Sequence, residues 1–238
     1  PPARRSRVAG VMKTIWRRLG LCALAGWACG AAAAEIPVLR YEVVFKDAAV
    51  ATQTLTIVET GDRKTVATSF EADLPVFVTL QHYSERQTAT FRADGTVERL
   101  EATRIDGPLR TDVVGFPLTN DVLQIVRTDR NGVATNRIAR DEYDFNSLAL
   151  YGTAPTNFLS ANQPQRVLSV LDGRVEPTTV QVIVESDTFE RQHLVSTHLV
   201  WTTGAFTSHS WHPERFSNLP RRYVRQTENG EFTFNLLR

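Results

Sequence analysis

The sequence predicts an all-β protein, a long antiparallel meander curled into a barrel or half barrel with one irregular or short-helical plug or lid segment. From residue 36 onward, apolar and polar side chains alternate with a period of two, as in strands with one buried face. Turn signals recur between these runs, as tight hairpins require. They are TGDR (60–63), ADG (93–95), IDGP (105–108), DRNG (129–132), TTG (202–204) and ENG (228–230). No long run has the period of a helix, which argues against a parallel α/β fold.

The first 34 residues have the three parts of a secretory signal. Met12, the single methionine of the chain, is followed by cationic residues, then by the apolar run LGLCALAGWACGAAAA and small residues before Glu35. We expect cleavage after Ala34, which leaves one β domain at 35–238 in the periplasm or outside the cell.

Three alternatives concern this leader. Residues 1–11 either precede the true start or extend the cationic region. A retained membrane anchor is disfavoured because the apolar run is slightly short for a span of about 20 residues. Lipid attachment at Cys22 or Cys29 is disfavoured because Leu21 and Trp27 fit the residues before the cysteine poorly.

Removal of the leader changes the charge. It takes away six basic and no acidic residues, so 21 Lys and Arg remain against 26 Asp and Glu, a net charge of −5. An acidic chain argues against a nucleic-acid partner. Both cysteines of the sequence leave with the leader, which excludes disulfides, thiolate catalysis and cysteine metal sites in the expected mature chain.

Three runs show the expected buried faces most clearly. Their inward residues are Leu39, Tyr41, Val43 and Phe45; Val180, Val182 and Val184; and Phe232, Phe234 and Leu236. The stretch 76–92 contains no Gly or Pro and would span roughly 55 Å as one strand. We expect a bulge or bend near residues 84–86, which suits a curled sheet.

Residues 140–164 interrupt the meander. The segment begins with RDEYDFNSLALYG and continues without helix or strand period. A short helix could start near Asn146 or Ser147 and stop at Gly152. About 25 residues without sheet character usually form a lid, a binding loop or a plug.

The sequence of this segment favours apolar binding over chemistry. A curled sheet with an inward aromatic face forms an apolar cavity, which is the default ligand site. The segment either covers the mouth of that cavity as a lid or completes the core as a plug. The ligand-binding candidates are Tyr143, Phe145, Leu148, Tyr151 and Phe158.

Several short motifs carry a resemblance. The chain contains RYEV (40–43), TLTI followed by GDR (54–63), FRADG (91–95) and a short hydrophobic strand at its end. It resembles an uncharacterised family of secreted bacterial proteins, a domain of unknown function. Unlike that pattern, the first hairpin, KDAAVATQ, contains no glycine.

The C-terminal segment WHPERFSNLPRRYVRQ carries a second resemblance. It is similar to another uncharacterised periplasmic family, in which Leu-Pro opens a strand; here Leu219-Pro220 would open an edge strand. Both families look like relatives of the half-barrel carriers that move lipoproteins through the periplasm. The resemblance implies a curled antiparallel sheet with a hydrophobic concave face, and it implies no catalytic residues.

The candidates for chemistry are few. The motifs HLVSTH and HSWH would form a metal site only if His198 and His209 paired across strands, and solvent-exposed or turn-capping histidines are the better interpretation. Ser147 has no identifiable base, and the acids at 141–144 and at 185–187 read as solvated surface. We predict no catalytic residue, no metal ligand and no cofactor, and leave open whether the protein is an enzyme.

The functional hypothesis is a periplasmic binding or carrier protein for a hydrophobic or amphipathic, lipid-like molecule. The alternative is a non-enzymatic cell-envelope assembly or interaction protein that binds another envelope protein through a sheet edge. Neither hypothesis involves nucleic acid.

Overall fold

The computed structural model describes residues 34–76, 79–119, 121–151, 164–189, 192–213, 219–227 and 230–237. These residues form strands and one short 3-10 helix, η1. In chain order the elements are β1 (Ala34–Phe45), β2 (Ala48–Thr60), β3 (Arg63–Val76), β4 (Thr79–Arg92), β5 (Val97–Asp106), β6 (Leu109–Thr119), β7 (Val122–Asp129), β8 (Gly132–Ala139), η1 (Arg140–Glu142), β9 (Phe145–Asn146), β10 (Gln165–Ser169), β11 (Arg174–Phe189), β12 (Gln192–Thr203), β13 (Phe206–Pro213), β14 (Arg222–Thr227) and β15 (Gly230–Leu237).

All the strands belong to one 15-stranded sheet with the order β8-β7-β6-β5-β4-β3-β2-β1-β15-β14-β13-β12-β11-β10-β9. Neighbouring strands are antiparallel except β9 and β10, which are parallel. The sheet is open, with β8 at one edge and β9 at the other. In the described part of the chain, no helix has the length and apolar character needed to cross a membrane. The all-β meander that the sequence predicts is therefore confirmed.

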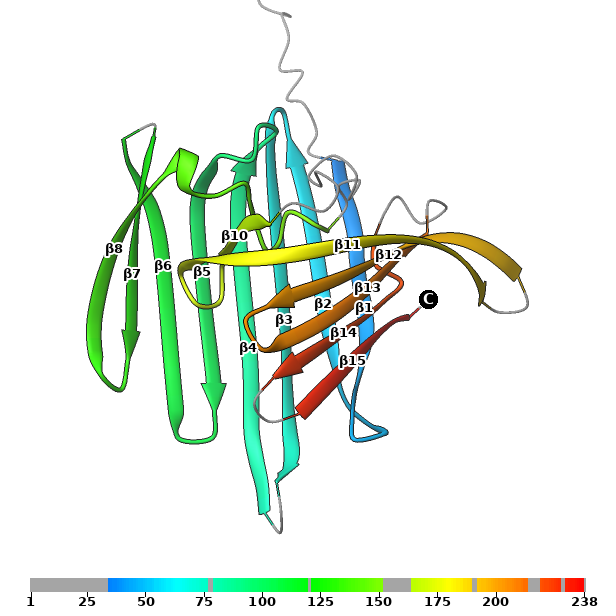
Figure 1. Cartoon of the computed structure of the whole chain (residues 1–238). Coiled ribbons are helices and arrows are strands. Elements are labelled where there is room, and N and C mark those ends of the chain that lie inside the picture. Colours follow the sequence, from blue (N-terminus) through cyan, green and yellow to red (C-terminus); the bar gives the residue numbers. More distant parts are fainter. Residues whose placement is uncertain are drawn as a thin grey trace, which may run out of the picture. The chain divides into compact units, whose positions relative to one another are not determined.

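The sheet curls so that its two halves face each other. In Figure 1, β11 to β15 run at a steep angle across the strands β1 to β5. Contacts between the halves are direct, because the rings of Phe70 on β3 and Tyr83 on β4 lie 6.1 and 5.6 Å from the ring of Phe232 on β15. The predicted half barrel is the observed architecture.

The alternating residues of the first and last strands fill the space between the halves. The inward side chains of Tyr41, Phe45, Phe232 and Phe234 are completely buried. On β11 the alternation only partly predicts burial. Val180 is buried, whereas Val182 and Val184 are exposed. The pairing of β10 with β11 ends at Thr178, and these two valines lie beyond it.

Most of the long run without Gly or Pro is one strand. β4 covers residues 79–92, whereas Val76 is the last residue of β3. β4 pairs with β3 without any shift of register, and the bulge expected near residues 84–86 is wrong. The irregularity on β4 lies instead between Thr90 and Phe91, opposite β5. The curl is spread along the strand as twist and needs no local break there.

The short helix expected from Asn146 or Ser147 is also absent. Phe145 and Asn146 form β9, and turns follow as far as Tyr151, whereas Gly152 lies outside the described residues. The side chain of Asn146 does act as a cap, because its Oδ1 accepts a hydrogen bond from the Leu148 N–H at 3.0 Å. Pairing of β9 with β10 competes with helix formation at the expected start, and the sheet prevails.

The chain after Pro220 does not form an edge strand. β14 lies between β13 and β15 and is antiparallel to both, which corrects the expectation for this segment. It pairs with β13 at residues 222–224 and with β15 at residues 222–227, so β14 is an inner strand of the sheet.

The first hairpin turns without glycine, as its sequence requires. Lys46 and Asp47 connect β1 to β2 and both have positive φ, 49° and 62°. L-residues seldom adopt this conformation, although Asp tolerates it better than most. The turn is therefore a site of local backbone strain.

Candidate ligand-binding cavity

A cavity of about 250 Å³ lies between the end of the interrupting segment and the inward face of β10 to β14. Residues Ser147, Leu150 and Tyr151 line it from the segment. Trp201 lines it from β12 and Tyr223 from β14. The cavity is thus enclosed by the curl of the sheet on one side and by the plug on the other.

The space exists because small side chains occupy the inward positions of β13. Ser208 and Ser210 alternate on the face that Trp201 occupies on β12, and both line the cavity. The corresponding positions on β15 carry Phe232 and Phe234, which fill their part of the half barrel. Side-chain volume, rather than backbone geometry, opens the cavity in one place and closes it in the other.

The hydroxyl groups of the cavity wall are paired with one another. The Trp201 indole Nε1–H donates to Ser210 Oγ at 3.2 Å, and His212 Nε2 lies 2.9 Å from the same oxygen. The hydroxyls of Thr178 and Thr203 are 2.8 Å apart. Because these groups have partners within the wall, the aromatic and aliphatic surfaces beside them can face a ligand; one buried donor of the lining, the Nε of Arg225, has no partner.

Two tyrosines form the wall nearest the plug. The rings of Tyr151 and Tyr223 meet edge to face at 6.3 Å, and Tyr223 stacks on Phe234 at 4.1 Å. The Tyr223 hydroxyl donates to Gln53 Oε1. Burial raises the pKa of both tyrosines, so both hydroxyls stay protonated and act only as neutral hydrogen-bonding groups.

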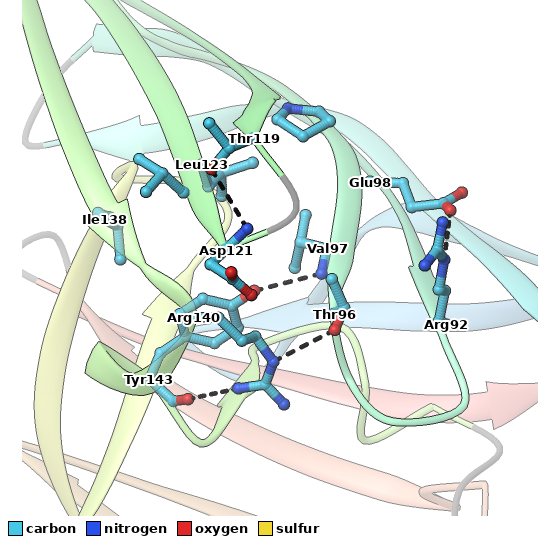
Figure 2. A pocket seen from close by; sticks show the side chains of 12 residues that line it. Arg92, Thr96, Val97, Glu98, Thr119, Asp121, Leu123, Ile138, Arg140 and Tyr143 are labelled. Carbon is cyan, nitrogen blue, oxygen red and sulfur yellow. Dashed lines mark hydrogen bonds and ion pairs between the residues drawn. The ribbon is translucent and has the colours of Figure 1, made fainter.

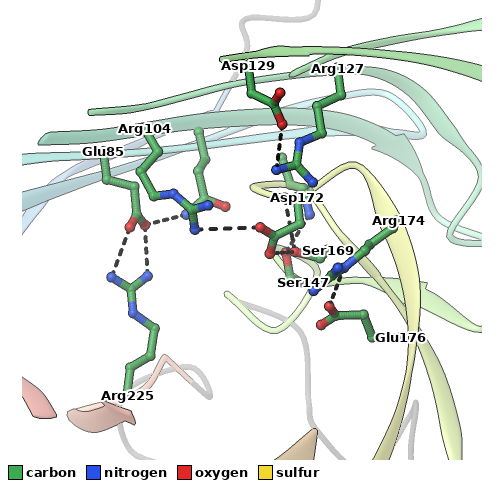
Figure 3. A network of polar contacts seen from close by, with 12 residues as sticks. Glu85, Arg104, Arg127, Asp129, Ser147, Ser169, Asp172, Arg174, Glu176 and Arg225 are labelled. Atoms are coloured by element: carbon green, nitrogen blue, oxygen red, sulfur yellow. Dashed lines mark hydrogen bonds and ion pairs between the residues drawn. The ribbon is translucent and has the colours of Figure 1, made fainter. Parts of the chain in front are cut away.

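A buried ion pair forms the inner end of the cavity wall. Arg225 on β14 lines the cavity, and its two terminal nitrogens donate to both carboxylate oxygens of Glu85 at 2.8 and 2.9 Å. Glu85 belongs to β4 and its side chain is 1% exposed. Tyr83 and Gln87 donate to the same carboxylate at 2.9 and 2.6 Å. Figure 3 shows the pair spanning the space between the two halves of the sheet.

Both members of this pair are charged. Burial by itself would raise the pKa of Glu85, but the Arg225 charge and the hydrogen bonds from Arg225, Tyr83 and Gln87 hold it below its ordinary value. Burial would lower the pKa of Arg225, and the Glu85 carboxylate more than compensates, so this pKa is raised. The bidentate geometry is the strongest form of such a contact.

A second set of polar contacts ties the β10–β11 turn to the opposite half of the sheet. Asp172 Oδ1 lies 3.5 Å from Nη1 of Arg104 on β5, and Asp172 Oδ2 accepts from Ser169 Oγ at 2.9 Å. Figure 3 shows these residues beside the Glu85–Arg225 pair. Gly173 follows in the same turn with φ of 64°, and a Cβ there would lie 2.8 Å from side-chain atoms of Val113 and Ile125. Close packing holds this corner of the cavity in place.

A smaller and more polar pocket of about 120 Å³ lies at the start of the interrupting segment. Arg140 dominates it, because its guanidinium donates to the carbonyl oxygens of Asp94 and Tyr143 at 2.7 and 2.9 Å. The same guanidinium lies 4.9 Å from the centre of the Tyr143 ring. Figure 2 shows Arg140 and Tyr143 together with Thr96 and Val97. These contacts anchor the beginning of the plug.

The five predicted ligand-binding residues do not form one site in the structure. Tyr143 lines the smaller pocket, where its hydroxyl accepts the Val97 N–H at 3.2 Å. Phe145 and Leu148 are buried in the core, and Phe145 packs edge to face on Trp201. Tyr151 lines the larger cavity. Phe158 lies outside the described residues. The described part of the segment, residues 140–151, is thus buried in the core at Phe145 and Leu148 and forms a cavity wall at Leu150 and Tyr151.

The other candidates for chemistry have structural contacts. Ser147 Oγ accepts the Val170 N–H at 3.1 Å, and Asp144 forms an ion pair with Arg166 at 2.8 Å. His198 and His209 lie on neighbouring strands. Nε2 of His198 is 3.1 Å from Nδ1 of His209. The cross-strand pairing that a metal site would require is therefore present.

Sequence reasoning missed most of the cavity wall. The signal at β13 is weak but readable, since Ser208, Ser210 and His212 alternate as small or polar residues where a core strand would have large apolar ones. The signal at β4 is similar, because Tyr83, Glu85 and Gln87 share the inward face. Neither pattern identifies its partner across the half barrel.

Comparisons with known proteins support the fold. No family model matches the chain, and no curated protein matches it either. Among solved structures, the chain is similar to a β-barrel-like protein of the domain of unknown function DUF1849 from Brucella abortus, with a TM-score of 0.58 and 9% identity. The match covers 84% of this chain and 95% of that one. The likeness shows that this chain has a β-barrel-like fold shared with a domain of unknown function.

Proposed function

We propose that the protein is an exported binding or carrier protein that holds a small hydrophobic or amphipathic molecule in the cavity beside Tyr151 and Trp201. The observation that carries the proposal is the cavity itself, which has aromatic walls and a few converging polar groups. Its volume of about 250 Å³ is close to the lower end of the usual range for ligand sites, about 300 to 1,000 Å³.

The size of the cavity favours a single acyl chain or a small ring system over a lipid with several chains. Binding would be driven by removal of apolar surface from water, about 25 cal/mol for each Å² buried, less the cost of ordering the ligand. Since the hydroxyls of Thr178, Thr203 and Ser210 already have partners, polar groups of the ligand would contribute mainly to its orientation.

An apolar strip beside the cavity supports a ligand with a tail. Val182 and Val184 lie on the same face of β11 as Thr178, which lines the cavity, and are 39% and 72% exposed. Val195 of β12 lies on the same face and is 61% exposed. A chain too long for the cavity would extend along these three side chains.

Export and a lipid-like ligand belong to the same proposal. The cationic, apolar and small-residue parts of residues 1–34 support export. The concave inner face of the half barrel supports the likeness to lipid-handling carriers, and a periplasmic carrier needs a cavity that shields an apolar chain from water.

A binding titration tests the proposal. We expect a fluorescent fatty acid to bind the wild-type protein, and Ser208→Leu to abolish binding because leucine would occupy the cavity. Thr207→Leu is the matched control, since it adds the same side chain to the adjacent position, which points to the opposite face of β13. Equal binding by all three proteins, or by none, would exclude the cavity as the site.

The second candidate function is interaction through a sheet edge. β8 is an eight-residue edge strand without proline, and its residues 132–137 are exposed, with Val133 70% exposed. Such an edge can pair with a strand of another envelope protein. Val133→Lys should remove a co-purifying partner if the edge is used, and retention of the partner would exclude this edge.

A further inference from the structure

The strands that line the cavity carry a pair of imidazoles at positions that alternate with Trp201, Ser208 and Ser210, and His209 is also among the residues that border the cavity. His198 on β12 is opposite Trp211, and His209 on β13 is opposite Val200, so the histidines are diagonal neighbours across the two strands. His198 Nε2 and His209 Nδ1 are 3.1 Å apart. We propose that this pair binds a divalent transition-metal ion, with Zn²⁺ as the simplest case.

The spacing of the two nitrogens suits a shared ion. Zinc–nitrogen bonds of about 2.0–2.1 Å place two ligands of a tetrahedral ion about 3.3–3.4 Å apart. The observed separation differs from this by only a few tenths of an ångström, and the ring centres are 5.3 Å apart. An ion bound here would take the place of the proton that the two nitrogens share in their hydrogen bond, and small rotations of the side chains would then direct both nitrogens at it.

Glu185 favours the tautomer of His198 that a metal requires. The Nδ1 of His198 lies 3.5 Å from Oε1 of Glu185, which favours a proton on Nδ1. Nε2 then accepts a hydrogen bond from the Nδ1–H of His209, and a bound ion would replace that proton. The Trp211 indole donates to the same oxygen of Glu185 at 2.6 Å and stacks on the His198 ring at 4.5 Å. A carboxylate behind a ligating histidine is the usual arrangement in metal sites.

A carboxylate beside the pair favours a bound cation. Oε1 of Glu185 lies 3.5 Å from His198 Nδ1. The guanidinium of Arg222 also belongs to this cluster and lies 5.1 Å from the centre of the Trp211 ring.

The site has two protein ligands. Within the described residues there is no group of three or more His, Cys, Asp or Glu side chains placed to hold a metal ion. Water or a ligand from a partner would complete the coordination, and binding is expected to be weaker and more exchangeable than in a structural zinc site.

Isothermal titration of the full-length protein with Zn²⁺, after chelator treatment, tests the proposal. We expect one ion per chain, with affinity lowered at least tenfold in His198→Gln and His209→Gln. Glu185→Gln should lower it about tenfold through loss of the supporting carboxylate. His82→Gln is the matched control, because His82 also lies near carboxylates, 3.2 Å from Asp73 and 3.8 Å from Glu71, but has no second imidazole.

Three results would overturn the proposal. They are the absence of Zn²⁺ binding in the wild type, unchanged affinity in His209→Gln, and loss of the site in His82→Gln. Thermal unfolding without metal checks that each variant is folded. If His198→Gln does not fold, His209→Gln alone decides the outcome.

Discussion

The half barrel is solid at one end of its inward face and hollow at the other, although the same alternating strands build both regions. Between β1, β3, β4 and β15 the inward residues are large rings, and Phe45, Phe70, Phe232 and Phe234 leave only small exposed fractions, 0 to 4%. Between β10 and β14 the inward residues include Ser208 and Ser210, and a cavity of about 250 Å³ remains. The difference shows that side-chain size at a few inward positions decides where this fold has a cavity and where it has a packed core.

The Glu85–Arg225 pair lies at the boundary between the two regions. Arg225 lines the cavity, and its guanidinium is also 5.6 Å from the ring centre of Phe234 in the solid region. The pair therefore connects the wall of the cavity to the closely packed part of the half barrel.

The largest loss of stability is expected when a large side chain is removed from the closely packed region. Phe232→Ala removes a completely buried ring that packs on Phe45 at 4.9 Å and on Tyr83 at 5.6 Å. We expect a loss of about 4 kcal/mol in the free energy of unfolding. Urea denaturation measures it, and a loss below about 1 kcal/mol would mean that this region is not the stable core.

Removing the charge of Glu85, at the boundary of the two regions, should lower the free energy of unfolding somewhat less. Glu85→Gln leaves the Arg225 guanidinium buried without a counter-charge, and we expect a loss of about 3 kcal/mol at pH 7. Because the pKa of Glu85 is lowered in the folded state, its contribution is complete above the ordinary value of 4.5 and disappears as the pH falls through the folded pKa.

Chemical denaturation of the wild type and Glu85→Gln between pH 3 and pH 7 measures this dependence. The difference between the two proteins should shrink on the acid side. A difference that stayed constant over this range would show that the carboxylate does not contribute through its charge.

Filling the hollow region should change binding far more than stability. For Ser208→Leu we expect a stability change within about 1 kcal/mol, because the added methyl groups enter existing space. The same substitution should remove ligand binding, as measured by the fatty-acid titration. A loss of several kcal/mol would mean that the cavity is already filled or cannot accommodate the side chain.

The smallest change in stability is expected from a substitution outside both regions. Asp47→Gly relieves the positive φ of the first hairpin and should raise the free energy of unfolding by about 0.5–1 kcal/mol. Ligand binding should not change. Altered binding would show that the hairpin and the cavity are coupled.

The solid region could be predicted from the sequence, because it follows from local alternation. Tyr41, Val43 and Phe45, and then Phe232 and Phe234, are buried as the period of two requires. The expected bulge on β4 was wrong because strand twist can spread the curl over many residues, which local sequence does not reveal. The expected helix was wrong because Phe145 and Asn146 find strand partners in Val167 and Leu168, 22 residues away.

The hollow region and its boundary could not be predicted in this way. Glu85 and Arg225 are separated by 140 positions, and only the closure of the half barrel brings them together. The interrupting segment was recognised as a plug or lid, but its side chains divide between two pockets and the core according to tertiary packing. Inward serines on β13 gave a readable signal of space, although not of what encloses it.

Native mass spectrometry of the protein purified gently from its own cells, followed by organic extraction, tests the central claim most directly. The account predicts a reproducible added mass that extracts as a lipid-like or amphipathic molecule from the wild type and from Thr207→Leu, and a bare chain for Ser208→Leu. A bare wild-type chain that also fails to take up a fluorescent fatty acid would contradict the account, as would the same added mass on Ser208→Leu.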